Sequence, residues 1–141
     1  MADTSGLLAA LDATHPDGDG ARAVLDSAGA LVVSPVLLAE LDHVGTRVLG
    51  RAATSAAIDD LRRWARVGRV LLPEITADVL DTAQALRVQY RGLDVDLADA
   101  VDVVLAGQFG TNAILTLDER DYRVIKPLSA HEAFMLLPRD T

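Results

Sequence analysis

Short apolar runs that alternate with longer helical patterns are the feature that most constrains the fold of this chain. Three such runs occupy residues 30–33, 70–72 and 113–116, and each follows a segment with helical periodicity. Continuously apolar strands are typical of a parallel sheet whose two faces are both buried, with helices forming the crossovers. The pattern therefore predicts an α/β fold in which helices cover a mainly parallel sheet and the crossovers are right-handed.

Capping residues and glycines set the limits of the predicted helices. Ser34 followed by Pro35 is typical of a helix start, and Thr76 and Asp96 are suited to cap two later helices. We also expect Ser5 to cap the first helix. The predicted helices cover about residues 5–11, 21–28, 36–48, 53–67, 77–90 and 96–109. Residues 132–137 fit either a last strand or a helical turn.

The size and composition of the chain limit its class. We expect its 141 residues to form one domain, residues 1–141, because 50% of the side chains are hydrophobic and can build a core. The absence of Cys excludes disulfides, thiolate metal sites and a Cys nucleophile. We find no signal peptide and no membrane-spanning run, and so expect a cytoplasmic protein without membrane contact. The net charge of −8 argues against non-specific nucleic-acid binding, but not against a local site that recruits a divalent cation.

Four acidic residues fall where an α/β fold collects its functional groups. Asp3 and Asp118 each follow a predicted strand, and sites in open parallel sheets form at the carboxyl ends of strands. Glu40 lies on the apolar face of the third predicted helix, and Asp99 lies near the start of the most apolar one. Each of these acids, taken alone, is also explained as a helix cap, a turn residue or a solvated side chain.

The four acids together predict a metal site. Two carboxylates about 4 Å apart repel by roughly 4 kcal/mol at an effective dielectric constant of about 20, so protons or a divalent cation must compensate them. An all-oxygen ligand set favours Mg²⁺, with Mn²⁺ as a substitute, over Zn²⁺. Such an ion binds phosphate oxygens and lowers the pKa of a bound water, which suits phosphodiester hydrolysis without a covalent intermediate. Asp121 competes with Asp118 for the fourth position, and Asp102 is at most a supporting residue.

With these residues in place, the sequence resembles the PIN-domain ribonucleases, and specifically the VapC-type toxins of type II toxin–antitoxin systems. The resemblance covers essentially the whole chain and rests on motifs in the family's order and spacing. The motifs are Asp3-Thr4-Ser5, Ser34-Pro35 through Glu40, Leu97-Ala98-Asp99-Ala100, and Leu115-Thr116-Leu117-Asp118 followed by Asp121-Tyr122. None of them is specific alone, but the ordered set is. Only two residues precede Asp3, where the family commonly has a longer first strand.

The resemblance implies a fold and roles for the four acids. The fold would be a three-layer α/β/α sandwich around a central, mainly parallel sheet of five strands. Asp3 and Asp99 would be the principal metal ligands. Glu40 and Asp118 would complete the acidic pocket, directly or through water, and help to orient the attacking water.

The resemblance also implies a substrate and partners. Ser5 or Thr116 would contact the scissile phosphate of an RNA, often a structured RNA such as a transfer RNA or a ribosomal RNA loop. Members of the family usually form homodimers, and a cognate antitoxin silences each toxin by covering its groove. The expected function is thus an Mg²⁺-dependent endoribonuclease toxin. Two alternatives stay open: a housekeeping RNA-processing nuclease, and a catalytically silent module of the same fold that binds RNA or protein.

A basic segment is a further candidate for RNA binding. Residues 47–69 contain six Arg and two Asp, so the segment carries about +4 in an otherwise acidic chain. An ordinary solvated helix face explains the segment as well. Trp64 within it is more typical of a core residue than of a base-stacking platform. The three histidines share no spacing, and His43 at most lies near the site.

Overall fold

The computed structural model describes residues 1–141 and places seven helices between and around four short strands. The helices are α1 (Thr4–Leu11), α2 (Gly18–Ser27), α3 (Pro35–Val48), α4 (Arg51–Arg66), α5 (Ala77–Gln89), α6 (Leu97–Gln108) and α7 (Glu119–Tyr122). The strands are β1 (Leu31–Val32), β2 (Val70–Leu71), β3 (Ala113–Leu115) and β4 (Met135–Leu137). The predicted α/β class is confirmed, and residues 132–137, for which the sequence allowed a strand or a helical turn, contain the strand β4.

The strands form two parallel pairs. β1 pairs with β2, and β3 pairs with β4 with Ile114 opposite Leu136. Residues 1–3 lie between the two pairs: the Ala2 N–H donates to the Val32 carbonyl, and Ala2 forms one bridge with Leu115. The predicted five-stranded sheet is therefore not confirmed. Residues 1–3 form a single bridge with β3 and not a continuous fifth strand.

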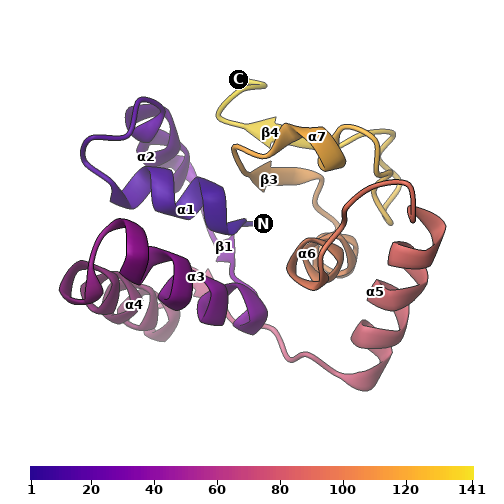
Figure 1. Ribbon diagram of the computed structural model, residues 1–141, viewed down its shortest axis with the longest axis horizontal. Coiled ribbons are helices and arrows are strands. Elements are labelled where there is room, and N and C mark those ends of the chain that lie inside the picture. The colour runs from indigo at the N-terminus through magenta and orange to yellow at the C-terminus, as the bar shows by residue number, and fades with distance from the viewer.

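Helices cover both faces of this central layer. Val32, Ile114 and Leu136 belong to a core that they share with α5, α6 and Tyr122. The alternate strand residues, including Leu31 and Leu115, face a second core with α1, α3 and α4. Because successive side chains of a strand point to opposite faces, the short apolar runs feed two cores at once. Figure 1 shows α1 to α4 on one side of the strands and α5 and α6 on the other, with the N-terminus between them.

The start of α1 differs from the sequence-based expectation. Asp3, not Ser5, is the N-cap, and its Oδ1 accepts a 2.7 Å hydrogen bond from the Thr4 N–H. Ser5 is already helical, and its hydroxyl bonds elsewhere. The caps predicted at Ser34, Thr76 and Asp96 are confirmed by hydrogen bonds from N–H groups of the first turn.

The first turn of α1 packs directly on the backbone of β3. A Cβ atom built on Gly6 would lie 2.4 Å from the Leu115 carbonyl oxygen. Glycine at this position therefore lets the helix approach the strand and keeps Asp3 beside the end of β3. None of the helices combines the length and apolar character needed to cross a membrane.

Candidate active site

Four different elements carry the four acids predicted from the sequence. Asp3 caps α1, Glu40 lies in α3, Asp99 lies in the first turn of α6, and Asp118 caps α7. Asp3 is buried, Glu40 and Asp99 are half-buried, and Asp118 is exposed. The charges of Asp3 and Asp118 both act on Asp99, so these three acids lie within electrostatic reach of one another.

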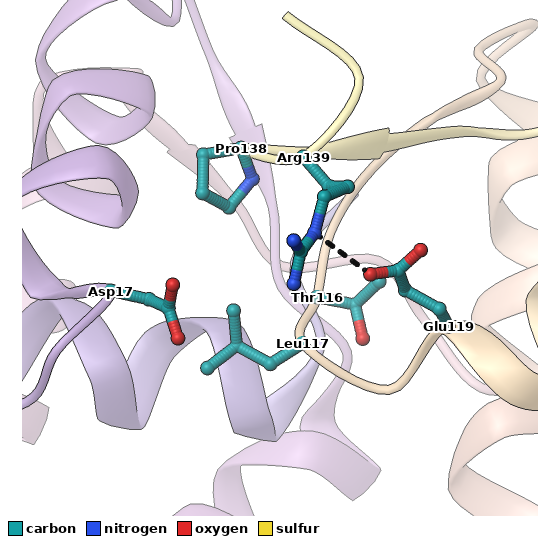
Figure 2. A pocket seen from close by; sticks show the side chains of 6 residues that line it. All are labelled: Asp17, Thr116, Leu117, Glu119, Pro138 and Arg139. Carbon is teal, nitrogen blue, oxygen red and sulfur yellow. Dashed lines mark hydrogen bonds and ion pairs between the residues drawn. The ribbon is translucent and has the colours of Figure 1, made fainter.

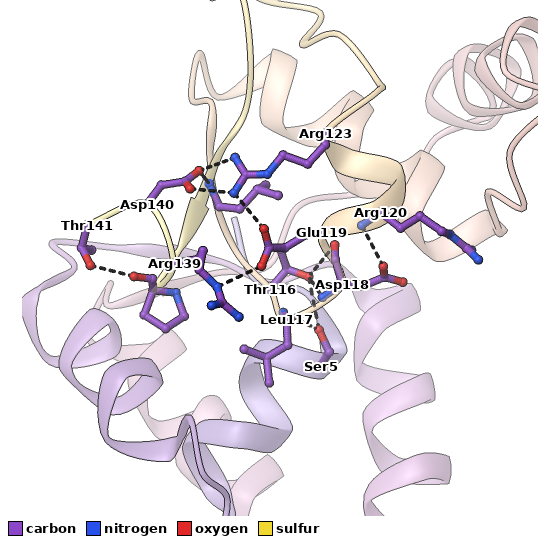
Figure 3. Close-up of polar contacts among 12 residues, drawn as sticks. Ser5, Thr116, Leu117, Asp118, Glu119, Arg120, Arg123, Arg139, Asp140 and Thr141 are labelled. Carbon is purple, nitrogen blue, oxygen red and sulfur yellow. Dashed lines mark hydrogen bonds and ion pairs between the residues drawn. The ribbon is translucent and has the colours of Figure 1, made fainter.

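The carboxylate of Asp3 is held by two hydroxyl groups. Ser5 Oγ donates to Asp3 Oδ2 at 2.6 Å, and Thr116 Oγ1 donates to the same oxygen at 2.7 Å. Each hydroxyl has one proton, so both oxygens are left as acceptors. They accept from the backbone N–H groups of Leu117 and Asp118, at 2.9 and 3.0 Å. Figure 3 shows Ser5, Thr116 and Asp118 converging where β3 ends. With the bond from the Thr4 N–H, three donors fix the orientation of the Asp3 carboxylate.

Glu40 joins the same region through the residue after Asp3. Thr4 Oγ1 donates a 2.7 Å hydrogen bond to Glu40 Oε2. The bond connects α1 to α3 and orients the carboxylate from its position on the inner face of the helix. It leaves Glu40 Oε1 without a protein partner and available to water or a ligand.

Asp99 occupies a place where a negative charge is costly without a cation nearby. Burial, followed by the charges of Asp96 and Asp3, raises the pKa of Asp99 to about 7. The Tyr122 hydroxyl donates to Asp99 Oδ1 at 3.1 Å and opposes this rise. A divalent cation beside Asp99 would favour its ionised form and reverse the effect of burial.

Asp102, one turn later on α6, is more deeply buried than any of the four predicted acids. Its side chain is 0% exposed, and neither carboxylate oxygen has a hydrogen-bond partner. Burial, followed by the charges of Asp3 and Asp99, raises its pKa well above the usual range. From the sequence we expected at most a supporting role for Asp102. It is the third acid on one helix face after Asp96 and Asp99, a pattern typical of a face exposed to solvent.

The structure separates the two candidates for the fourth acid. Asp121 is 3% exposed, and its Oδ1 lies 3.1 Å from Arg120 Nε in an ion pair. Asp118 is exposed, forms no ion pair, and its charge acts on Asp99. An acid already neutralised by arginine is poorly suited to bind a cation, so the geometry favours Asp118.

The acidic side chains of this centre are suited to bind a divalent cation, although they do not yet surround a single binding position. No three acidic or histidine side chains already converge at the spacing of metal ligands. Asp3, Glu40, Asp99 and Asp102 nevertheless bring carboxylates together, and no Arg or Lys forms an ion pair with any of them. Buried and half-buried oxygen ligands without a counter-charge favour a hard ion such as Mg²⁺ or Mn²⁺.

An open cavity of about 290 Å³ adjoins this centre on the side of Thr116. Its lining residues are Asp17, Thr116, Leu117, Glu119, Pro138 and Arg139. Figure 2 shows Arg139 pointing into the opening, where its Nε donates to Glu119 Oε1 at 3.0 Å. The cavity gives the buried Thr116 a route to solvent, beside the hydroxyls that hold Asp3.

The basic segment lies mainly on α4 and is partly neutralised. Arg62 and Arg63 pair with Asp59 and Asp60 one turn earlier on the helix. Trp64 packs against the second core, as expected of a core residue, and the Arg69 guanidinium lies 6.0 Å from its ring centre. His43 is exposed and makes no hydrogen bond in the structure.

Sequence reasoning missed three features of this centre. The Tyr122 hydroxyl, the Thr4 hydroxyl and the orphaned Asp102 carboxylate were not assigned to it. Tyr122 lies in α7, whose four residues are too few for a helical period to be seen in a sequence. The expected contact of Ser5 or Thr116 with phosphate stays a prediction; in the structure both hydroxyls donate to Asp3.

Comparison with known proteins agrees with this arrangement. The model of the PIN domain family matches residues 1–127. Ribonuclease VapC26 of Mycobacterium tuberculosis is 37% identical over 137 residues, covering 96% of this chain and 98% of that protein. The crystal structure of Mycobacterium tuberculosis VapC20, described as a sarcin-ricin loop cleaving toxin, superposes with a TM-score of 0.72 and 21% identity, over 84% of this chain and 89% of that one. The family match and the curated relative together show that this chain belongs to the PIN-domain family and is of the VapC type.

Proposed function

We propose that this protein is a divalent-metal-dependent endoribonuclease that acts as the toxin of a toxin–antitoxin pair. The observation that carries the proposal is the acidic centre itself: Asp3 and Asp99, from distant parts of the chain, share one site without a basic counter-charge. RNA as the substrate is supported by the name ribonuclease of the 37% identical relative. Mg²⁺ is the expected ion, with Mn²⁺ as a substitute.

The residues of the site have distinct roles in this proposal. Asp3 and Asp99 would hold the ion, which when bound would supply charge stabilisation at the phosphate and lower the pKa of water. Ser5 and Thr116 fix the orientation of Asp3, because both donate to its Oδ2. Glu40 Oε1, which has no protein partner, would accept a proton or orient the attacking water.

Asp118 contributes to the solvent-exposed side of the site through both its backbone and its side chain. Its backbone N–H donates to Thr116 Oγ1, and Oδ1 of its exposed carboxylate accepts from the Arg120 N–H, which leaves Oδ2 to accept from water or to approach the ion. The Tyr122 hydroxyl fixes the orientation of the Asp99 carboxylate by donating a hydrogen bond to it. No covalent enzyme intermediate is required, since hydrolysis needs only an activated water and an oriented phosphate.

The proposal extends to partners and location. A homodimer and a cognate antitoxin are expected, as for other VapC-type proteins, in the cytoplasm. An antitoxin arginine could neutralise Asp3 and Asp99 by paired hydrogen bonds and block ion binding. Adding the antitoxin should then lower cleavage, and a complex as active as the free chain would count against this part.

The test is cleavage of RNA by the purified chain. We expect cleavage with Mg²⁺ or Mn²⁺, none with EDTA, and none with Asp99→Asn, whose circular dichroism should match that of the parent. Asp81→Asn is the matched control, because Asp81 is an exposed helical acid without a hydrogen bond or ion pair. Cleavage by folded Asp99→Asn at the parent rate would overturn the proposal. Mapping the new 5′ ends in total RNA identifies the target.

A further inference from the structure

The two side-chain oxygens of Asp102 are the buried polar side-chain atoms of this chain that lack a hydrogen-bond partner. Buried polar groups in folded proteins are hydrogen-bonded in the large majority of cases, so each exception calls for a physical reason. Asp102 is 0% exposed and lies in the middle of α6, among Val101, Val103 and Val104. A carboxylate at such a position costs free energy unless something on its open side compensates it.

The surroundings of Asp102 identify that open side. After burial itself, the groups that act most strongly on its carboxylate are Asp3 and Asp99, and Glu40 also contributes. These are the acids of the candidate active site. The α-amino group of Met1, which donates one hydrogen bond to the Ala113 carbonyl at 3.0 Å, is a nearby positive group that partly offsets these charges. Asp102 therefore shares the electrostatic environment of the acidic centre, and no group donates a hydrogen bond to its carboxylate.

Because the acidic side chains do not converge on one point, their arrangement favours an action of Asp102 on the ion through water molecules. No three acidic side chains converge closely enough to enclose an ion directly. Mg²⁺ commonly keeps several waters and takes only one or two carboxylates. Water molecules around an ion donate hydrogen bonds outwards, and the unused oxygens of Asp102 are acceptors on the buried side. Such outer partners tune the affinity of a metal site.

We propose that Asp102 is a positioning residue of the divalent-ion site, where its carboxylate accepts hydrogen bonds from water around the ion and adds negative charge from the buried side. This inference rests on the proposed metal-dependent function and adds a fifth acid to its site. Asp102 itself does not touch the substrate.

A purely structural role for Asp102 predicts a different pattern of effects. If the carboxyl group only fills space in the core, Asp102→Asn preserves its shape and leaves ion binding unchanged. If it serves the ion, the same variant has two effects of opposite sign. The metal-free protein becomes more stable, because an acidic group that is costly to bury beside other carboxylates is removed, while the affinity for the ion falls.

The experiment measures Mn²⁺ binding by the full chain, without RNA, by electron paramagnetic resonance and calorimetry. The variants are Asp102→Asn, Asp102→Ala and Asp99→Asn, with Asp81→Asn as the control of equal charge change. We expect Asp102→Asn to weaken Mn²⁺ binding by about tenfold, the range found for outer partners of metal sites. The melting temperature of Asp102→Asn, measured in EDTA, should be higher than that of the parent. Asp102→Ala should weaken binding similarly, and Asp81→Asn should bind as the parent does.

The outcomes separate this inference from the proposed function. If Asp99→Asn loses Mn²⁺ binding while both Asp102 variants bind like the parent, Asp102 has no role at the ion and only this inference is overturned. If the parent binds no Mn²⁺ at millimolar concentration, the metal-dependent function fails and the inference fails with it. If Asp102→Asn does not fold, the affinity of Asp102→Ala decides.

Discussion

The Thr116 hydroxyl donates a 2.7 Å hydrogen bond to Asp3 Oδ2, joining two residues that are 113 positions apart in the chain. Both residues are buried and each lies where its segment of the central layer ends. Together with the backbone hydrogen bonds between residues 1–3 and Leu115, this bond holds the two segments at one acidic centre. Because its acceptor is charged, it is of the stronger class of protein hydrogen bonds.

Thr116→Val tests this relationship. Valine has nearly the same shape but no hydroxyl, so Asp3 loses one donor and the Asp118 N–H loses its acceptor. We expect a loss of about 1.5–3 kcal/mol in the free energy of unfolding, typical of hydrogen bonds to charged groups, measured by urea denaturation. RNA cleavage should fall as well, because Asp3 is no longer fixed. Thr82→Val removes an exposed hydroxyl from α5 and should change neither property. Equal stability of the two variants would contradict the role of Thr116.

Glu40 can be tested with a pair of variants. Glu40→Gln keeps an oxygen that accepts from Thr4 Oγ1, whereas Glu40→Ala leaves that buried hydroxyl without its acceptor. We expect Glu40→Gln to lose cleavage activity with little change in melting temperature, and Glu40→Ala to lose activity and about 1–3 kcal/mol of stability. Rates on a defined RNA and thermal melts check both. If Glu40→Gln cleaves at the parent rate, the charge of Glu40 is not needed.

The contact between α1 and β3 predicts a strong effect at Gly6. A methyl group at Gly6 would overlap the Leu115 backbone, which cannot move without disturbing the strand. We expect Gly6→Ala to lower the free energy of unfolding by about 1–3 kcal/mol or more, as for other overpacked sites. Gly29→Ala is the control, because nothing lies within 4 Å of the place that its Cβ would occupy. Similar urea midpoints for both variants would show that α1 does not depend on this close approach.

The C-terminal segment predicts a pH dependence of stability. Hydrogen bonds from Arg123 lower the pKa of Asp140 to about 2, and the N–H of Leu136 also donates to this carboxylate. A carboxyl group whose pKa is lower in the folded state stabilises the fold above its unfolded pKa, and the contribution is lost as the pH falls through the folded pKa. Asp140→Asn should therefore melt below the parent at pH 5–7. The difference should shrink between about pH 4 and pH 2.

The exposed Asp26, which makes no hydrogen bond or ion pair, provides the control for this pH series. Asp26→Asn should melt like the parent throughout. If the difference in melting temperature between Asp140→Asn and the parent stays constant down to pH 2, Asp140 is not the source of the pH dependence. Figure 3 shows the ion pairs of Arg123 that hold this segment against α7.

Most helices could be predicted from the sequence because their signals are local. Ser34, Thr76 and Asp96 cap helices with their own side chains, and a cap needs only the next three residues. The first cap was placed wrongly at Ser5, because Ser and Asp are both suitable capping residues and the two lie only two positions apart; in the folded chain the Ser5 hydroxyl donates to Asp3 instead. The five-stranded sheet was expected from the resemblance, and residues 1–3 instead form one bridge.

The site could be predicted in outline but not in its contacts. Asp3 and Asp118 were proposed from the rule that sites form at strand ends, which needs only the order of elements, whereas Glu40 and Asp99 were proposed as acids on apolar helices. The environment of Asp102 depends on which acids from other segments lie above it, and no local pattern carries this information. The hydroxyl of Tyr122 is aligned with Asp99 by the packing of α7 on α6. Such contacts exist only in the folded chain.

The most direct measurement of the central claim is a crystal structure of the chain soaked in Mn²⁺, with data collected at the manganese absorption edge. The account predicts an anomalous peak in contact with the carboxylates of Asp3 and Asp99. Density maps without a peak among these side chains, at Mn²⁺ concentrations that support RNA cleavage, would contradict it.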